Sequence, residues 1–203
     1  MSIFSNSRRD FLKTMGLSAA AIAQQKHLFG AVSGKRPNVI FLYIDDVSNE
    51  MVGCYGGKYL TPNIDSLARD GMKFNRFYIT ASICTPSRYG SLTGHYASRC
   101  KSLQKQFPPG GPVNLRWNTQ LSAGEKTIAS VLKQNGYVTG MVGKWHLGAP
   151  RGEKLESMRY YNPTSRDAGR LKRNYERICN HIRSVAGFDY IDGIYSGNIH
   201  DII

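Results

Sequence analysis

The sequence of 203 residues is 41% hydrophobic and 11% aromatic, and its formal net charge is +13. This composition supplies enough apolar side chains for a buried core, which excludes a wholly disordered chain. The basic charge comes without a nucleic-acid-binding motif or an uninterrupted basic run, so we expect no nucleic-acid partner. The four cysteines are too few and too irregularly spaced to predict a disulfide framework or a zinc site.

Residues 1–30 have the layout of an export signal. Arg8 and Arg9 precede an apolar run from Met15 to Ala23 that is too short for a stable membrane span. Residues 7–13 (SRRDFLK) resemble the twin-arginine signal. This resemblance implies that the twin-arginine export machinery is a partner, with a final location in the periplasm, on the cell surface or in the medium. The alternative is an amphipathic N-terminal helix in which the two arginines adjoin by chance.

The ordered part of the chain is expected to begin with a strand, a helix and a second strand. Residues 38–46 (NVIFLYIDD) form a continuous apolar run that ends in two carboxylates, as in a central strand buried on both faces. Residues 61–71 predict a short helix, with Thr61 as the N-cap and Pro62 at the first helical position. Residues 72–80 (MKFNRFYIT) alternate like a strand.

A second short helix is expected within residues 82–94 (SICTPSRYGSLTG). Thr85 is the predicted N-cap, Pro86 the first helical residue, and Gly94 the end of the helix. Cys84 is therefore placed at the N-terminus of a helix.

A helix and a strand are predicted next along the chain. Ser122 and Glu125 have the spacing of a capping box before an amphipathic helix at 126–136 (KTIASVLKQNG). The predicted strand at 137–143 (YVTGMVG) leads directly into residues 144–148 (KWHLG). Strands that alternate with helices indicate an α/β fold with a mostly parallel sheet flanked by helices.

Several polar residues fall at the ends of the predicted strands, where ligands bind in parallel α/β folds. We expect Asp45, Asp46, Lys144 and His146 to lie at one edge of the sheet, beside Cys84. In an extended segment, Lys144 and His146 would point to the same side. Each residue also has a plainer interpretation: two aspartates are common in turns, a lone histidine is usually structural, and a cysteine is usually a small buried side chain.

Taken together, the residue types at this edge favour binding of a tetrahedral anion. Free N–H groups at a helix N-terminus and the guanidinium of Arg88 both attract negative charge. Paired carboxylates such as Asp45 and Asp46 bind hard cations such as calcium or magnesium. Metal, lysine, arginine and histidine around one oxyanion indicate hydrolysis of a phosphate or sulfate ester.

Residues 151–186 form a basic insert before residues 187–190 (GFDY). Apolar residues at helical spacing predict an amphipathic helix within this insert: Leu171, Tyr175, Ile178, Ile182 and Val185. Its basic face would suit a sulfated polysaccharide, although a solvated helix face explains the same charges.

Three separated segments resemble the type I sulfatases of the alkaline-phosphatase superfamily. Residues 84–88 (CTPSR), followed by Leu-Thr-Gly, resemble the family signature Cys-x-Pro-Ser-Arg, and residues 136–146 (GYVTGMVGKWH) resemble its second signature. Residues 36–46 together with 61–78 resemble the opening strand and first helix of the family. The fold implied is an alkaline-phosphatase-like sheet flanked by helices, of which residues 36–203 are expected to form the amino-terminal portion, incomplete at the C-terminus.

The resemblance also implies a catalytic mechanism. Cys84 would be oxidised to formylglycine, by a formylglycine-generating or an anaerobic sulfatase-maturing enzyme. The hydrated aldehyde would attack sulfur and later release sulfate by breaking its own C–O bond. Asp45, Asp46 and the modified Cys84 would bind the metal, with calcium expected in preference to magnesium.

The remaining roles implied by the resemblance fall on three basic side chains. Arg88 would stabilise the formylglycine hydrate, while Lys144 and His146 would hold the sulfate and assist the leaving group. The substrate would be a sulfated small molecule or a sulfated glycan.

The sequence also departs from the family pattern. Ser91 stands where the family usually has a bulky aliphatic residue, and no match to the family's later metal ligands is found up to Ile203. Two other hypotheses therefore stay open beside a sulfatase. One is a phosphomonoesterase or phosphonate hydrolase of the same superfamily, although a serine or threonine nucleophile is more usual there. The other is a truncated, non-catalytic fragment that binds anions.

Overall fold

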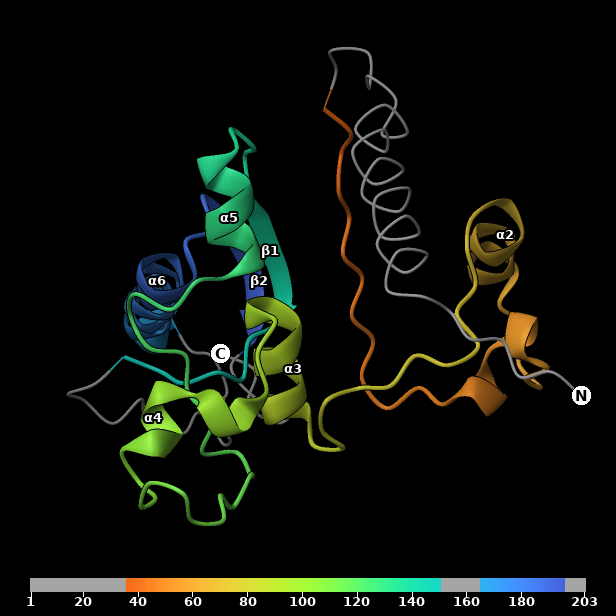
Figure 1. Cartoon of the computed structure of the whole chain (residues 1–203). Helices are drawn as coiled ribbons and strands as arrows, with labels where there is room; N and C mark the ends of the chain where they lie inside the picture. Colours follow the sequence, from red (N-terminus) through yellow and green to blue (C-terminus); the bar gives the residue numbers. More distant parts are fainter. Residues whose placement is uncertain (1–35, 151–164, 196–203) are drawn as a thin grey trace, which may run out of the picture. The chain divides into compact units, whose positions relative to one another are not determined.

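The computed structural model describes residues 36–150 and 165–195 (Figure 1). The first unit ends at Val47 and the second begins at Ser48. Each unit is described by itself. The elements of the second unit are, in order, η2 (Asn49–Met51), η3 (Gly53–Tyr55), α2 (Pro62–Asp70), α3 (Cys84–Thr93), η4 (Ala97–Arg99), α4 (Lys101–Gln104), α5 (Ile128–Gln134), β1 (Gly140–Lys144), α6 (Ser165–Ala186) and β2 (Tyr190–Tyr195). The predicted export signal at 1–30 and residues 151–164 of the predicted insert lie outside the described residues.

Strands β1 and β2 form a parallel pair, as predicted for an α/β fold. Gly140 lies opposite Tyr190 and Lys144 opposite Tyr195, with an irregularity between Val142 and Gly143. Gly143 has a φ of 92°, a backbone conformation that glycine adopts without a Cβ clash. A parallel pair requires a crossover between its strands, and α6 lies in that connection. The strand β2 was not predicted from the sequence, where only the GFDY segment (187–190) at its start was noted.

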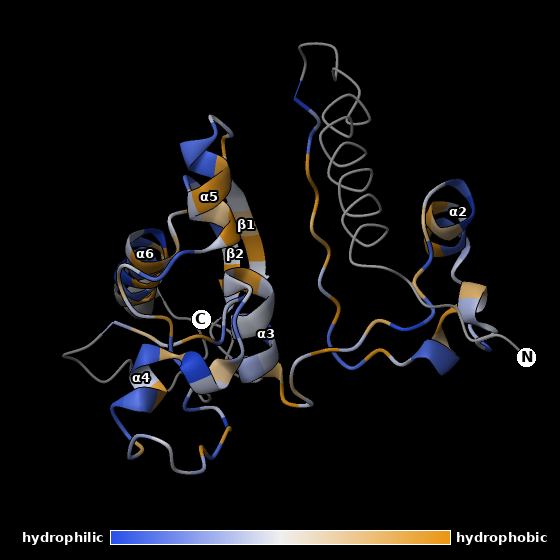
Figure 2. Cartoon of the chain, in the orientation of Figure 1, coloured by the Kyte–Doolittle hydropathy of each residue, from blue (hydrophilic) through white to orange (hydrophobic). Residues whose placement is uncertain are grey.

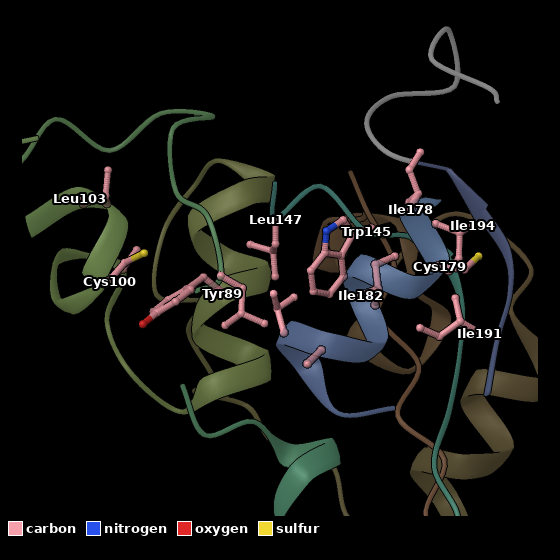
Figure 3. Close-up of a cluster of buried hydrophobic side chains, with 14 residues drawn as sticks. Tyr89, Cys100, Leu103, Trp145, Leu147, Ile178, Cys179, Ile182, Ile191 and Ile194 are labelled. Atoms are coloured by element: carbon pink, nitrogen blue, oxygen red, sulfur yellow. The ribbon is translucent and has the colours of Figure 1, made fainter. Parts of the chain in front are cut away.

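The apolar stripe of α6 forms much of the hydrophobic core, as its spacing predicts. Ile178 and Ile182 are 2% and 0% exposed, and Val185 is also buried. Figure 3 shows Ile182 in the same cluster as Trp145, which follows β1, and Ile191 and Ile194 of β2. The amphipathic helix predicted from the sequence is therefore confirmed over Ser165–Ala186. No helix in the described ranges is both long enough and apolar enough to cross a bilayer.

Asp189 of the GFDY segment joins the starts of β1 and β2. Its carboxylate accepts hydrogen bonds from the backbone N–H and the hydroxyl of Thr139, both at 3.0 Å. Lys133, at the end of α5, approaches the other carboxylate oxygen at 2.5 Å. The hydrogen bonds from Lys133 and Thr139 favour the charged form and lower the pKa of Asp189. This carboxylate thus links α5 to both strands.

Helix α5 begins later than its predicted capping box. Thr127 is the N-cap, and its hydroxyl oxygen accepts a hydrogen bond from the N–H of Ser130 at 3.0 Å. In return, the Ser130 hydroxyl oxygen accepts the N–H of Thr127 at 2.9 Å. The predicted box at Ser122 and Glu125 closes a turn instead, in which the Glu125 carboxylate accepts the N–H of Ser122 at 2.6 Å. Both pairs satisfy the spacing rule, and the buried Thr127 has the additional partner Ala186 O.

Helix α2 was predicted correctly, with Pro62 as its first residue. Thr61 hydrogen-bonds to the carboxylate of Asp65 at 3.0 Å, and Asp65 also accepts the N–H of Cys54 in η3 at 2.7 Å. A Cβ at Gly53 would lie 2.5 Å from that carboxylate, so a side chain there would displace Asp65. However, Leu67 is 71% exposed, and the predicted inward face of α2 is covered only in part.

The predicted strands at 38–46 and 72–80 are not formed. Residues 38–44 have no regular secondary structure, and Figure 2 shows that much of this segment is hydrophobic. Their apolar side chains are largely exposed, with Ile40 at 92% and Leu42 at 73%. Residues 72–80 are likewise exposed throughout. A strand requires a neighbour to satisfy its backbone groups, and within the described ranges only β1 and β2 are paired.

Candidate functional site

Helix α3 places Cys84 at its first residue. Ile83 is the extended N-cap, and its carbonyl accepts the N–H of Ser87 at 3.2 Å. The helix therefore begins one residue before the predicted N-cap Thr85, and Pro86 lies within its first turn, where the missing N–H has no intrahelical partner to lose. The predicted end at Gly94 is confirmed by a φ of 71°. Cys84 therefore lies at a helix N-terminus, as the sequence predicts.

His146 lies against Cys84. The two atoms in contact are Cys84 Sγ and His146 Nδ1, which are 3.2 Å apart. Both side chains are partly exposed, whereas Thr85, Pro86 and Ser87 behind the thiol are buried. The thiol and the imidazole thus form a partly exposed hydrogen-bonding contact.

The backbone at His146 is left-handed, with a φ of 54°. Outside glycine, this conformation costs about 1–2 kcal/mol and persists where surrounding contacts hold it. The prediction that Lys144 and His146 share a side through strand alternation was wrong in its geometry, because β1 ends at Lys144 and the chain turns at His146. The left-handed turn, not alternation, brings the imidazole to Cys84.

Arg88 and Lys144 also meet at this site. Arg88 Nη1 donates to the carbonyl oxygen of Lys144 at 2.9 Å, and the Lys144 residue is only 7% exposed. Trp145 is 1% exposed, and its indole N–H donates to Gly148 O at 2.7 Å. The structure thus brings together four of the six predicted site residues, namely Cys84, Arg88, Lys144 and His146.

Asp45 and Asp46 belong to the first unit, which is described by itself. Asp46 is left-handed, with a φ of 57°. Two adjacent carboxylates are suitable ligands for a hard cation, but calcium takes six to eight oxygen ligands. Over residues 36–150 and 165–195, no group of three or more His, Cys, Asp or Glu side chains is gathered to hold a metal ion. The metal role of Asp45, Asp46 and Cys84 therefore stays a prediction.

Tyr89 and Glu125 form a hydrogen bond beside the site that the sequence did not predict. Tyr89, on α3 beside Arg88, is 1% exposed, and its hydroxyl donates to Glu125 at 2.6 Å. Glu125 was interpreted as a helix cap only. The sequence signal for this pair was weak, because a tyrosine in a short helix and a glutamate 36 positions later have no characteristic spacing.

Comparison with known proteins identifies the family. A family model described as Sulfatase matches residues 37–195. The chain belongs to the sulfatase family. It is 39% identical to human arylsulfatase A over 128 residues, which cover 62% of the chain and 24% of arylsulfatase A. It is 40% identical to the N-acetylgalactosamine-6-O-sulfatase of Bacteroides thetaiotaomicron over 122 residues, or 59% of the chain and 22% of that relative.

Two solved structures resemble this sulfatase chain in fold. One was determined for Bacteroides thetaiotaomicron glycosaminoglycan metabolism; its TM-score is 0.51 at 30% identity, covering 80% of this chain and 28% of that one. The other is the crystal structure of Ps i-CgsB, with a TM-score of 0.53 at 28% identity, covering 81% and 29%. The family resemblance and the α/β fold class predicted from the sequence are thereby confirmed. The chain spans about a quarter of the length of the relatives it matches.

Proposed function

We propose that the protein to which this chain contributes hydrolyses sulfate esters, and that Cys84 supplies the nucleophile after conversion to formylglycine. The observation that carries this proposal is the contact of 3.2 Å between Cys84 Sγ and His146 Nδ1 at the N-terminus of α3. It lies within the region that matches the sulfatase family. In this protein the sequence Cys-Thr-Pro-Ser-Arg would be both the modification signal and the start of the site.

The surroundings of Cys84 suit an oxidised side chain at this position. Formylglycine supplies an aldehyde whose hydrate is an oxygen nucleophile that can be regenerated without a second ester hydrolysis. Cys84 is accessible in part, and an oxygen in place of Sγ would have the Nδ1 of His146 as a hydrogen-bond partner. His146 would accept a proton from that oxygen or return one to the departing alcohol.

Arg88 and Lys144 would supply positive charge around the sulfate. Arg88 reaches the carbonyl of Lys144, so its guanidinium lies between helix α3 and the end of β1. The N-terminus of α3 adds the partial positive charge of its first N–H groups. Together these groups would neutralise the charge that develops on the sulfate oxygens during attack.

We propose that the carboxylates of Asp45 and Asp46 bind a divalent metal. Asp45 and Asp46 have the carboxylate donors that hard cations prefer, and the family resemblance favours calcium over magnesium. Two carboxylates are too few for a complete site, so no step of the reaction is assigned to the metal.

The partners proposed for the whole protein follow from the same chemistry. A formylglycine-generating or anaerobic sulfatase-maturing enzyme would modify Cys84, and the twin-arginine machinery would export the folded product. The substrate would be a sulfated small molecule or a sulfated glycan. The outer face of α6 carries exposed Lys172, Arg173 and Arg183, whose charges would suit a glycan.

The test compares two cysteines in the full-length protein, produced together with a maturation enzyme. Cys84→Ala should abolish hydrolysis of an aryl sulfate, whereas Cys54→Ala, at another partly exposed cysteine, should leave it unchanged. Mass spectrometry should find formylglycine at position 84. Hydrolysis of the phosphate ester of the same phenol in preference to the sulfate would favour a phosphomonoesterase. Unmodified thiol in material from the native host, without turnover of either ester, would favour a non-catalytic anion-binding protein.

A further inference from the structure

His146 is held on both sides by hydrogen bonds to its neighbours' carbonyls. The carbonyl of Lys144 accepts Arg88 at 2.9 Å, and the carbonyl of Leu147 accepts the backbone N–H of Leu121 at 3.0 Å. Leu147 is itself 2% exposed in the core. These bonds fix the chain just before and just after the left-handed residue, which is what a strained turn needs in order to persist.

The second of these bonds is connected to α3 through Tyr89. The Tyr89 hydroxyl donates to Glu125 Oε1 at 2.6 Å, and Glu125 Oε2 accepts the N–H of Ser122 at 2.6 Å. Ser122 follows Leu121, the residue that binds Leu147. The helix that carries Cys84 is therefore linked to the turn that carries His146 by a second path, independent of Arg88.

The chemical state of Tyr89 suits this link. Burial raises the pKa of the Tyr89 hydroxyl above its ordinary value, and the hydrogen bond to Glu125 raises it further. The hydroxyl therefore stays protonated, and remains a hydrogen-bond donor, throughout the physiological pH range. Glu125 uses both carboxylate oxygens, one for the helix and one for the loop before α5.

We infer that Tyr89 and Glu125 are positioning residues, which keep the imidazole of His146 in contact with residue 84 by joining α3 to the 121–122 segment. The inference rests on the proposed function insofar as the contact is used in catalysis. Neither side chain is assigned a contact with substrate.

The chain offers a matched control for removing the Tyr89 hydroxyl. Tyr175 of α6 also donates to a carboxylate, Asp192 Oδ1, at 2.8 Å, and this bond joins α6 to β2 and not to α3 or the 144–148 segment. Tyr89→Phe and Tyr175→Phe each delete one hydroxyl and one hydrogen bond to a carboxylate. Only the Tyr89 bond lies on the path to His146, so a positioning role predicts a loss of kcat in Tyr89→Phe and none in Tyr175→Phe.

The kinetic test uses the mature full-length protein and an aryl sulfate. Tyr89→Phe should lower kcat about tenfold with KM unchanged, because small misplacements of a reacting group cost rate more than binding. Tyr175→Phe should leave kcat unchanged. Glu125→Ala should match Tyr89→Phe, and Glu125→Gln, which keeps one acceptor oxygen, should recover part of the loss. Equal kcat in wild type and Tyr89→Phe, or equal losses in the two tyrosine variants, would overturn the inference.

A second measurement does not require activity. In full-length protein made without the maturation enzyme, iodoacetamide alkylates the Cys84 thiol, and mass spectrometry can follow it with Cys54 as the internal reference. Tyr89→Phe should move the Cys84 rate severalfold toward the rate in His146→Ala, while Tyr175→Phe should not. If wild type hydrolyses no sulfate ester but the thiol rate shifts, the proposed function fails and the positioning role stands. An unchanged thiol rate in Tyr89→Phe refutes the positioning role.

Discussion

Residues 38–46 and residues 137–143 were expected to form two strands of one sheet, and they behave differently in the structure. The second segment forms β1, pairs with β2 and is followed by the buried Trp145. Among the described residues, the first forms no strand, and Ile40 is 92% exposed. Both lie within the range that matches the sulfatase family, so a family motif does not by itself bury a segment. Burial requires a partner surface, and α6 with β2 provides one for β1.

The largest effect is expected for a buried and an exposed aromatic residue: Trp145, which follows β1, and Phe77, in the predicted strand at 72–80 that is not formed. Trp145→Ala should reduce the free energy of unfolding by about 3–5 kcal/mol, because it removes a fully buried ring from the core. Phe77→Ala should change it by less than about 0.5 kcal/mol, because Phe77 is 78% exposed. Urea unfolding of the full-length protein, followed by far-ultraviolet circular dichroism, measures both values. A loss at Phe77 comparable to that at Trp145 would show that residues 72–80 are covered in the complete protein.

The sequence predicted best those features that depend on local chemistry. Helix α2, the end of α3 at Gly94 and the apolar stripe of α6 are each determined by residues within a few turns. The strand at 38–46 was wrong for the described structure because its burial depends on segments far away in the sequence. The pairing of β1 with β2 was missed in part for the same reason, since the partner begins 46 residues after Lys144.

The candidate site shows the same division. Its residue types and the position of Cys84 at a helix N-terminus were readable from the sequence. The left-handed turn at His146 was not readable from the sequence, because it depends on hydrogen bonds that Arg88 and Leu121 make to neighbouring carbonyls. Tyr89 and Glu125 were missed because their link depends on how α3 packs beside the loop at 121–127.

An intermediate effect is expected at the start of α5, where the sequence offered one cap and the structure uses another. Thr127→Ala should destabilise the protein by about 1 kcal/mol or somewhat more, because the hydroxyl caps Ser130 and also donates to the buried Ala186 carbonyl. Ser122→Ala should have almost no effect, because it is the backbone of Ser122 that binds Glu125. Thermal unfolding compares the two variants, and the reverse order would restore the capping box predicted from the sequence.

The smallest effect is expected at Asp189, which binds Thr139 before β1 and Lys133 of α5. Because the folded state lowers the pKa of this carboxyl, its contribution to stability is fully present above the unfolded value of about 3.9 and is lost as the pH falls through the lower folded value. Asp189→Asn should therefore lower the urea midpoint at pH 7, and the difference from wild type should shrink below about pH 4. Lys133→Gln should reproduce part of this loss, since the hydrogen bond from Lys133 is the main cause of the lowered pKa. The difference in urea midpoint between wild type and Asp189→Asn could instead stay constant down to pH 2.5. That result would mean that the asparagine disturbs packing and that the charge on Asp189 does not stabilise the fold.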